Sequence, residues 1–95
     1  MTTWKIGANV YRILLANNAQ KDLDKLRGKL WQRISKAISD LRIDPRPTGC
    51  TKLRGGENVY RLRISNYRVL YDIDDGSQTV AILRVKHRRN VYRSR

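Results

Sequence analysis

The stretch VYRLRISNYRVLYDI, residues 59–73, decides the fold of this chain. Two segments rich in β-branched and aromatic residues, 59–64 and 67–73, flank the polar pair Ser65-Asn66. Such segments separated by two turn-forming residues are typical of a β-hairpin. We therefore predict two antiparallel strands joined by a tight turn, which form the centre of a sheet.

The same turn determines which side chains share a face. A two-residue connection pairs Arg63 with Arg68, and strand alternation then places Arg61 beside them on one side of the sheet, the arginine face. Like charges directly opposite each other destabilise a sheet by up to about 1 kcal/mol per pair, so this clustering indicates a bound anion. The alternative is that alternating arginines only keep an exposed sheet face hydrated. The other face carries an apolar set suited to packing under helices: Tyr60, Leu62, Ile64, Tyr67, Val69, Tyr71 and Ile73.

A third strand follows at 79–86, after the turn signal Asp75-Gly76. A three-residue loop would place Arg84 and Lys86 on the arginine face, whereas a two-residue loop would turn both toward the helices. Burial of two cations without partners is costly, so we expect the three-residue loop. In either register the strand brings three further candidates to the end of the sheet near the first turn: His87, Arg88 and Tyr92.

The N-terminal half predicts a strand and a helical hairpin. Residues 10–15 read as a strand, and a glycine at Gly28 divides the helical pattern that follows into helices near 18–27 and 29–42. Residues 43–56 contain two prolines and three glycines and read as a loop. The expected fold is therefore α+β, with both helices on one face of the sheet. The apolar helical stripe consists of Ala19, Leu23, Leu26, Leu30, Ile34, Ile38 and Leu41.

Length and charge limit the function. Ninety-five residues suit one domain spanning 1–95. A net charge of +13 with a pI near 10.8 favours nucleic acid as the partner. The alternative is that the basic surface serves solubility alone. Cys50 is the only cysteine, so a reducing cytoplasm is expected and a multi-cysteine metal site is excluded. Arg12 interrupts the apolar run near the N-terminus, so no membrane span is expected. No cofactor is expected either.

Four motifs together resemble the RelE toxins of the RelE/ParE superfamily. They are KLRG at 52–55, YRLRI at 60–64, YRVLYDIDD at 67–75 and VKHRRNVYR at 85–93. The resemblance implies a toxin of a type II toxin–antitoxin pair that acts in the cytoplasm on mRNA in the ribosomal A site, without a metal. It also implies an acidic, RelB-like antitoxin. We expect that partner to cover the arginine face or to brace the helices through a segment that folds on binding.

The resemblance also assigns roles to individual residues. Arg68 is similar to the arginine that binds the phosphate at the cut, Arg88 to the arginine that stabilises the developing charge, and Tyr92 to the tyrosine that stacks on a base. Neighbouring cations are expected to bind the RNA backbone: Lys52, Arg54, Arg84, Lys86 and Arg89.

At two positions the chain departs from the family pattern. Arg61 and Arg63 fall where the best-studied members have lysines. A guanidinium supplies charge and forked hydrogen bonds but does not give up its proton at ordinary pH, so neither arginine suits general base catalysis. His87 is then the candidate for proton transfer, because histidine changes charge near neutral pH. The competing interpretation is that His87 is structural.

Two other functions fit parts of the sequence. A ParE-like toxin of the same superfamily inhibits DNA gyrase without cleaving RNA, and a plain RNA-binding module would cleave nothing. The pair His87-Arg88 followed by NVYR favours the nuclease.

Overall fold

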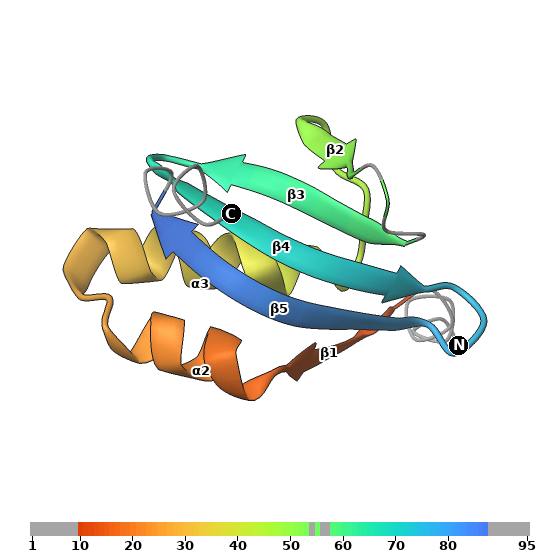
Figure 1. The fold of residues 1–95 in the computed structure, drawn as a ribbon, viewed down its shortest axis with the longest axis horizontal. Helices are drawn as coiled ribbons and strands as arrows, with labels where there is room; N and C mark the ends of the chain where they lie inside the picture. Colours follow the sequence, from red (N-terminus) through yellow and green to blue (C-terminus); the bar gives the residue numbers. More distant parts are fainter. Residues whose placement is uncertain (1–9, 54, 56–57, 88–95) are drawn as a thin grey trace, which may run out of the picture.

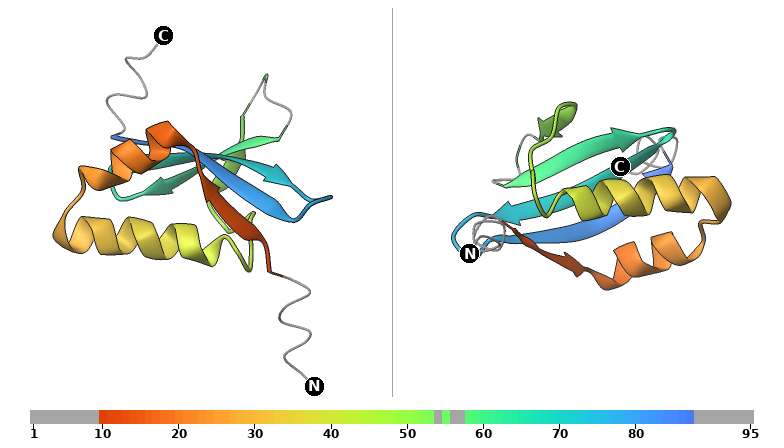
Figure 2. Two further views of the ribbon diagram at one scale, coloured as in Figure 1. Left: turned by 90° about the horizontal axis from the view of Figure 1, so that it is seen from below. Right: turned by 180° about the vertical axis from the view of Figure 1, so that it is seen from behind.

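The computed structural model describes residues 10–53, 55 and 58–87. These residues form one five-stranded sheet in the order β1-β5-β4-β3-β2, and α3 lies across one face of it while α2 lies beside β5 (Figures 1 and 2). The predicted α+β architecture is confirmed. In chain order the elements are β1 (Arg12–Leu15), α2 (Asn17–Asp24), α3 (Gly28–Asp40), β2 (Cys50–Lys52), β3 (Val59–Ile64), β4 (Tyr67–Asp74) and β5 (Thr79–His87).

The helical hairpin has the predicted break at Gly28. Its φ of +59° lies in the left-handed region, which glycine adopts without the steric cost that a side chain would add. The chain can therefore turn between α2 and α3, which end and begin within a few residues of the predicted bounds. Six members of the predicted apolar stripe are buried and the seventh, Leu30, packs against them.

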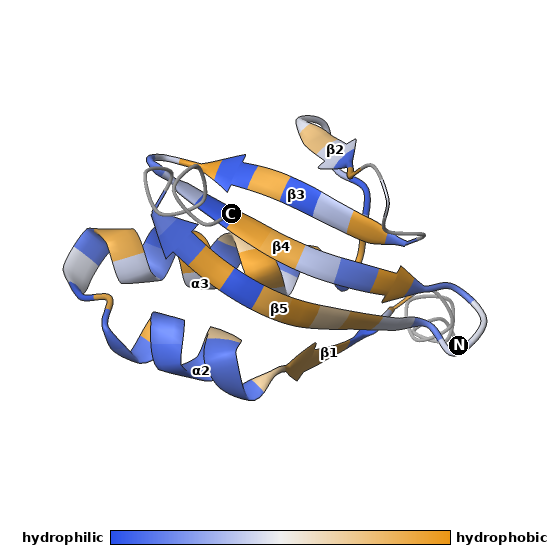
Figure 3. Ribbon diagram, in the orientation of Figure 1, coloured by the Kyte–Doolittle hydropathy of each residue, from blue (hydrophilic) through white to orange (hydrophobic). Residues whose placement is uncertain are grey.

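Strand alternation builds the other half of the core. Buried residues alternate with more exposed ones along β3 and the first half of β5, and the hydropathy alternates most clearly along β3 (Figure 3), as expected for a sheet with one covered face. Tyr71, at the centre of β4, is fully buried, and its hydroxyl donates a 2.8 Å hydrogen bond to the carbonyl of Pro45. Burial raises the pKa of the Tyr71 phenol, which stays protonated as a donor.

The predicted hairpin register is confirmed, but the prediction of an uninterrupted loop over 43–56 is wrong. Arg63 lies opposite Arg68 across β3 and β4. Within the predicted loop, β2 pairs antiparallel with β3, and Thr51 lies opposite Arg61. Three residues are too few to show a period of two, so the sequence pattern could not distinguish this strand from a loop.

The connection between β4 and β5 is longer than predicted. Asp74 pairs with Thr79, so four residues form the loop instead of three. A four-residue loop alone would have turned Arg84 and Lys86 toward the helices. However, a bulge lies between Leu70 and Tyr71, and on the Leu70 side of it the register is shifted by one residue. As a result Lys86 lies opposite Arg68, on the predicted face but for a different reason.

A polar cluster fixes the end of the sheet away from the Ser65-Asn66 turn. The Arg46 guanidinium binds both oxygens of Asp75, at 2.9 and 3.3 Å, and its Nε donates to the hydroxyl of Tyr60 at 3.1 Å. Tyr11, just before β1, donates a 2.6 Å hydrogen bond to the same carboxylate, so the start of β1, β3, the segment after α3 and the β4–β5 loop meet at one point. Hydrogen bonds from Arg46 and Tyr11 hold the pKa of Asp75 below its usual range.

Candidate nucleic-acid interface

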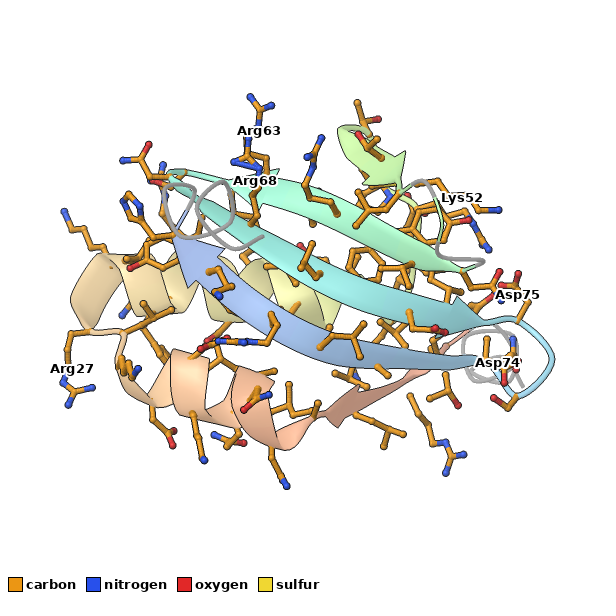
Figure 4. The ribbon with its side chains drawn as sticks, viewed as in Figure 1. Arg27, Lys52, Arg63, Arg68, Asp74 and Asp75 are labelled. Atoms are coloured by element: carbon orange, nitrogen blue, oxygen red, sulfur yellow. The ribbon has the colours of Figure 1, made fainter. Side chains whose placement is uncertain are left out.

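Three cations form one row across β3, β4 and β5, near the Ser65-Asn66 turn. Arg63 of β3 lies directly opposite Arg68 of β4, and Arg68 lies directly opposite Lys86 of β5. Figure 4 shows Arg63 and Arg68 close to each other at one end of the sheet. Side chains at directly paired positions have Cβ atoms about 4.5–5.5 Å apart, so this cation row concentrates positive charge. Arg61 lies two residues before Arg63 in β3, on the same face.

The members of the cation row differ in exposure. Arg63 is exposed and Lys86 is half-buried, whereas Arg68 has 3 % of its surface exposed. Burial restricts the motion of the Arg68 guanidinium. Its planar fork therefore loses little further freedom when it binds a ligand. Among the described residues no ion pair neutralises Arg61 or Arg63. The arginine face therefore combines a fixed cation with cations that can move toward an anion.

A hollow of about 280 Å³ opens beside Arg61 and Arg63 at the edge of the sheet. The other wall is formed by Gly49, just before β2, and by Thr51, within β2. The volume is several times the roughly 30 Å³ that one water occupies in the liquid, so a phosphate group fits. Sequence reasoning missed Gly49 and Thr51, because the strand that positions them has no signal of its own.

Arg84 makes a contact that the sequence did not predict. Its Nε and Nη2 donate to the carboxylate of Asp22 on α2 at 2.9 and 3.1 Å, and the backbone N–H of Val85 donates to the same carboxylate at 2.8 Å. Burial opposes ionisation of Asp22, but these hydrogen bonds outweigh it, so the pKa of Asp22 lies below its usual value. RNA binding by Arg84 remains a prediction, and RNA would compete with Asp22.

His87 and Lys52 lie away from the cation row. His87 pairs with Tyr67, whose side chain belongs to the helix-facing set, and the two rings meet edge-on. Lys52 lies opposite Tyr60 in the edge strand β2, toward the other end of β3 from Arg63 (Figure 4). Four other predicted site residues lie outside the described residues: Arg54, Arg88, Arg89 and Tyr92.

The described residues contain neither a candidate metal-binding group nor a helix that could span a membrane. Over residues 10–53, 55 and 58–87, no group of three or more His, Cys, Asp and Glu side chains could hold a metal ion. In the same ranges neither helix is long and apolar enough to span a bilayer.

The fold and the cation row define a small basic α+β protein with a cationic sheet face. Residues 13–92 match the family model of the ParE toxin of the type II toxin–antitoxin system parDE. The chain is 36 % identical to toxin RelG of Mycobacterium tuberculosis over 84 residues, which cover 87 % of this chain and 97 % of RelG. It is 31 % identical to toxin RelE3 of Methanocaldococcus jannaschii over 90 residues, covering 85 % and 94 % of the two chains.

Solved structures agree with this assignment. The RelE–RelB complex of Pyrococcus horikoshii contains a chain that matches with a TM-score of 0.74 at 27 % identity, covering 83 % of this protein and 96 % of that chain. A chain of the RelBE2 toxin–antitoxin complex of Mycobacterium tuberculosis matches with a TM-score of 0.70 at 35 % identity, covering 83 % and 99 %. This protein belongs to the RelE/ParE family of type II toxins, as a RelE-like member.

Proposed function

We propose that this toxin is a ribosome-dependent mRNA interferase, an endoribonuclease that cleaves mRNA in the ribosomal A site. The observation that carries the proposal is the cation row of Arg63, Arg68 and Lys86 on the sheet face opposite the helices. Three aligned cations cost stability unless an anion meets them, and a phosphodiester is such an anion. The relatives that carry RelE names support the same class of toxin.

The proposed chemistry needs no metal. The 2′-hydroxyl of the message attacks the adjacent phosphorus, so the protein has to hold the chain in line and stabilise the added negative charge. Arg68 is suited to bind the scissile phosphate, because its guanidinium is held by burial before substrate arrives. Arg61 and Arg63 bind neighbouring phosphates. Arg88 and Tyr92, beyond the described residues, are proposed to stabilise the developing charge and to stack on a base.

A ParE-like gyrase inhibitor is the second candidate, because the matching family model is that of ParE toxins. An interferase cuts the message and leaves gyrase active, whereas a ParE-like toxin inhibits gyrase and leaves the message intact. Purified toxin would be added to ribosomes translating a defined message, and the message ends would be mapped; the same preparation would be tested for inhibition of supercoiling by gyrase. Cuts within the A-site codon support the interferase. Intact message with inhibited supercoiling supports the ParE-like function, and intact message with unaffected gyrase excludes both.

We also propose a RelB-like antitoxin as the partner, as in the solved complexes of the similar toxins. A net charge of +13 favours an acidic chain. Beside β1 a groove of about 660 Å³ runs between the sheet and both helices, and its lining includes Leu15, Leu23 and Trp31. Of these, Trp31 is 45 % exposed and Leu15 is 40 % exposed. Large exposed apolar side chains at a groove are typical of a protein interface.

Binding to a cognate antitoxin tests this part of the proposal. Trp31→Ala should weaken binding by at least about tenfold if Trp31 is an anchor of the interface, since anchors contribute 2 kcal/mol or more. The control is Ile43→Ala, which removes an apolar side chain that is more exposed than Trp31, 67 % against 45 %, and that does not line the groove. Equal affinity of both variants would place the antitoxin elsewhere.

A further inference from the structure

The last residues of β5 have a neighbouring strand on one side only. β1 pairs with β5 from Thr79 to Ile82 and ends there, at Leu15. Among the described strands, residues 84–87 pair with β4 alone. The helix α2 lies beside the outer edge of β5 instead (Figure 1). Backbone groups at such an edge need another partner, because an unpaired and partly buried amide is costly.

The carboxylate of Asp22 on α2 supplies that partner. It accepts hydrogen bonds from the backbone N–H of Val85 at 2.8 Å and from Nε and Nη2 of Arg84 at 2.9 and 3.1 Å. The Asp22 side chain is only 11 % exposed, so water competes little for these contacts. Hydrogen bonds to an ionised group are roughly twice as strong as neutral ones. Asp22 therefore replaces a neighbouring strand for two consecutive residues of β5.

The two anchored residues come directly after the bulge. Tyr71 pairs with Ile82 and Leu70 pairs with Arg84, so Leu83 is the extra residue on β5. A bulge disrupts the ladder locally and leaves its extra residue unpaired. Asp22 thus holds β5 at the first point where the strand resumes regular pairing.

The shift at the bulge decides which way the end of β5 faces. Val85 is buried in the core, with 3 % of its surface exposed, and Lys86 lies opposite Arg68 in the cation row. Without the extra residue, strand alternation would exchange these two sides and turn Lys86 toward the helices. The place of Lys86 in the row therefore depends on a short stretch that β4 holds on one side and Asp22 on the other.

We infer that Asp22 is a positioning residue for the RNA-binding face, an inference that rests on the proposed interferase function. By anchoring Arg84 and Val85 it holds Lys86 opposite Arg68, where the ammonium group can meet a phosphate of the message. Asp22 acts through β5 and does not itself contact RNA. Its negative charge opposes RNA binding, so its role as an anchor and its role as a charge have opposite signs.

Titration of the full-length toxin with a short single-stranded RNA at several salt concentrations distinguishes the two roles. Asp22→Ala should weaken binding about threefold and reduce the slope of log affinity against log salt by about 0.7, because one phosphate contact is lost. Asp24→Ala, at an exposed position of the same helix, makes the same change in charge and should bind at least as tightly as wild type. Asp22→Asn keeps an oxygen acceptor for the Val85 N–H and should retain most of the wild-type slope. Asp22→Ala that binds more tightly than wild type would overturn the inference.

A double variant tests whether Asp22 acts through Lys86. Lys86→Gln should show the same loss of slope, and adding Asp22→Ala to it should cause no further loss. An equal further loss in the Lys86→Gln background would overturn the inference.

Amide hydrogen exchange tests the anchor without RNA. Residues 84–87 should exchange at least about tenfold faster in Asp22→Ala than in wild type, after correction for the change in the amides of β3, which report on global unfolding. Exchange that rises equally in β3 and in residues 84–87 would show that Asp22 only stabilises the fold. If wild-type toxin binds RNA without salt dependence, the proposed function fails, and the exchange rates still decide whether Asp22 anchors β5.

Discussion

The imidazole of His87 meets the ring of Tyr67 edge-on, with centroids 5.2 Å apart and planes inclined at 81°. The two residues are directly opposite each other across β4 and β5. Tyr67 packs against the core, so His87 lies on the helix side of the sheet while its neighbour Lys86 lies in the cation row. This geometry favours the structural interpretation of His87 over a role in proton transfer.

His87→Gln should therefore cleave mRNA at a rate within about threefold of wild type, a change of less than 1 kcal/mol in the barrier. Loss of the ring pair should instead reduce the free energy of unfolding by about 0.5–1.5 kcal/mol. Single-turnover cleavage on ribosomes over a wide pH range and thermal melting test both effects. A variant that cleaves a hundredfold more slowly, with a changed pH profile and an unchanged melting temperature, would show that His87 takes part in proton transfer.

Binding of RNA to the arginine face should depend steeply on salt. For single strands the slope of log affinity against log salt changes by about 0.7 for each phosphate neutralised. Replacing both Arg61 and Arg63 by Gln should therefore reduce the slope by about 1.4, measured by titration of a short RNA oligonucleotide or of ribosomes. The control is a variant in which Gln replaces two exposed cations of α3, Lys29 and Arg33, with the same change in net charge. Identical slopes for the two variants would show that only net charge attracts the RNA.

The contact between Asp22 and Arg84 should stabilise the fold in a pH-dependent way. Asp22 has 11 % of its side chain exposed and accepts three hydrogen bonds. Asp22→Ala should cost about 1–2 kcal/mol near pH 7, since Arg84 remains partly solvated. Asp24→Ala, at an exposed position of the same helix, should cost less.

The sign of the pH effect follows from the lowered pKa of Asp22. A carboxylate with a folded-state pKa below its unfolded value contributes stability above the unfolded value, near pH 4, and loses it as pH falls through the folded value. The difference between wild type and Asp22→Ala should therefore shrink below about pH 4. Urea unfolding at pH 7 and at pH 3 measures it. An undiminished difference at pH 3 would mean that packing, not charge, makes the contribution.

Sequence alone predicted the central hairpin, because the two-residue turn and the alternation of Leu62, Val69 and their neighbours permit one register. It predicted the helical break at Gly28 for an equally local reason. The strand β2 and the bulge between Leu70 and Tyr71 were not predictable, since both depend on contacts between distant segments. The pairing of Asp22 with Arg84 spans 62 positions and has no local signal.

Some features of the candidate site follow from local sequence patterns, and others depend on contacts between distant segments. Strand alternation and the two-residue turn are enough to place Arg61, Arg63 and Arg68 on one face of the sheet. The side of the sheet that Lys86 and His87 occupy depended on the bulge, which periodicity does not show. The lining of the hollow by Gly49 and Thr51 likewise depended on β2.

The cleavage rate of Arg68→Ala tests the central claim most directly. On ribosomes programmed with a defined message, under single-turnover conditions, this variant should cleave at a rate at least tenfold to about a hundredfold below wild type. Because Arg68 is buried, melting curves and a parallel Arg68→Lys variant, which keeps the charge, would separate lost catalysis from lost folding. Arg33→Ala, on the exposed face of α3, should cleave as wild type. Folded Arg68→Ala that cuts the A-site codon at the wild-type rate would contradict the account and move the site off the arginine face.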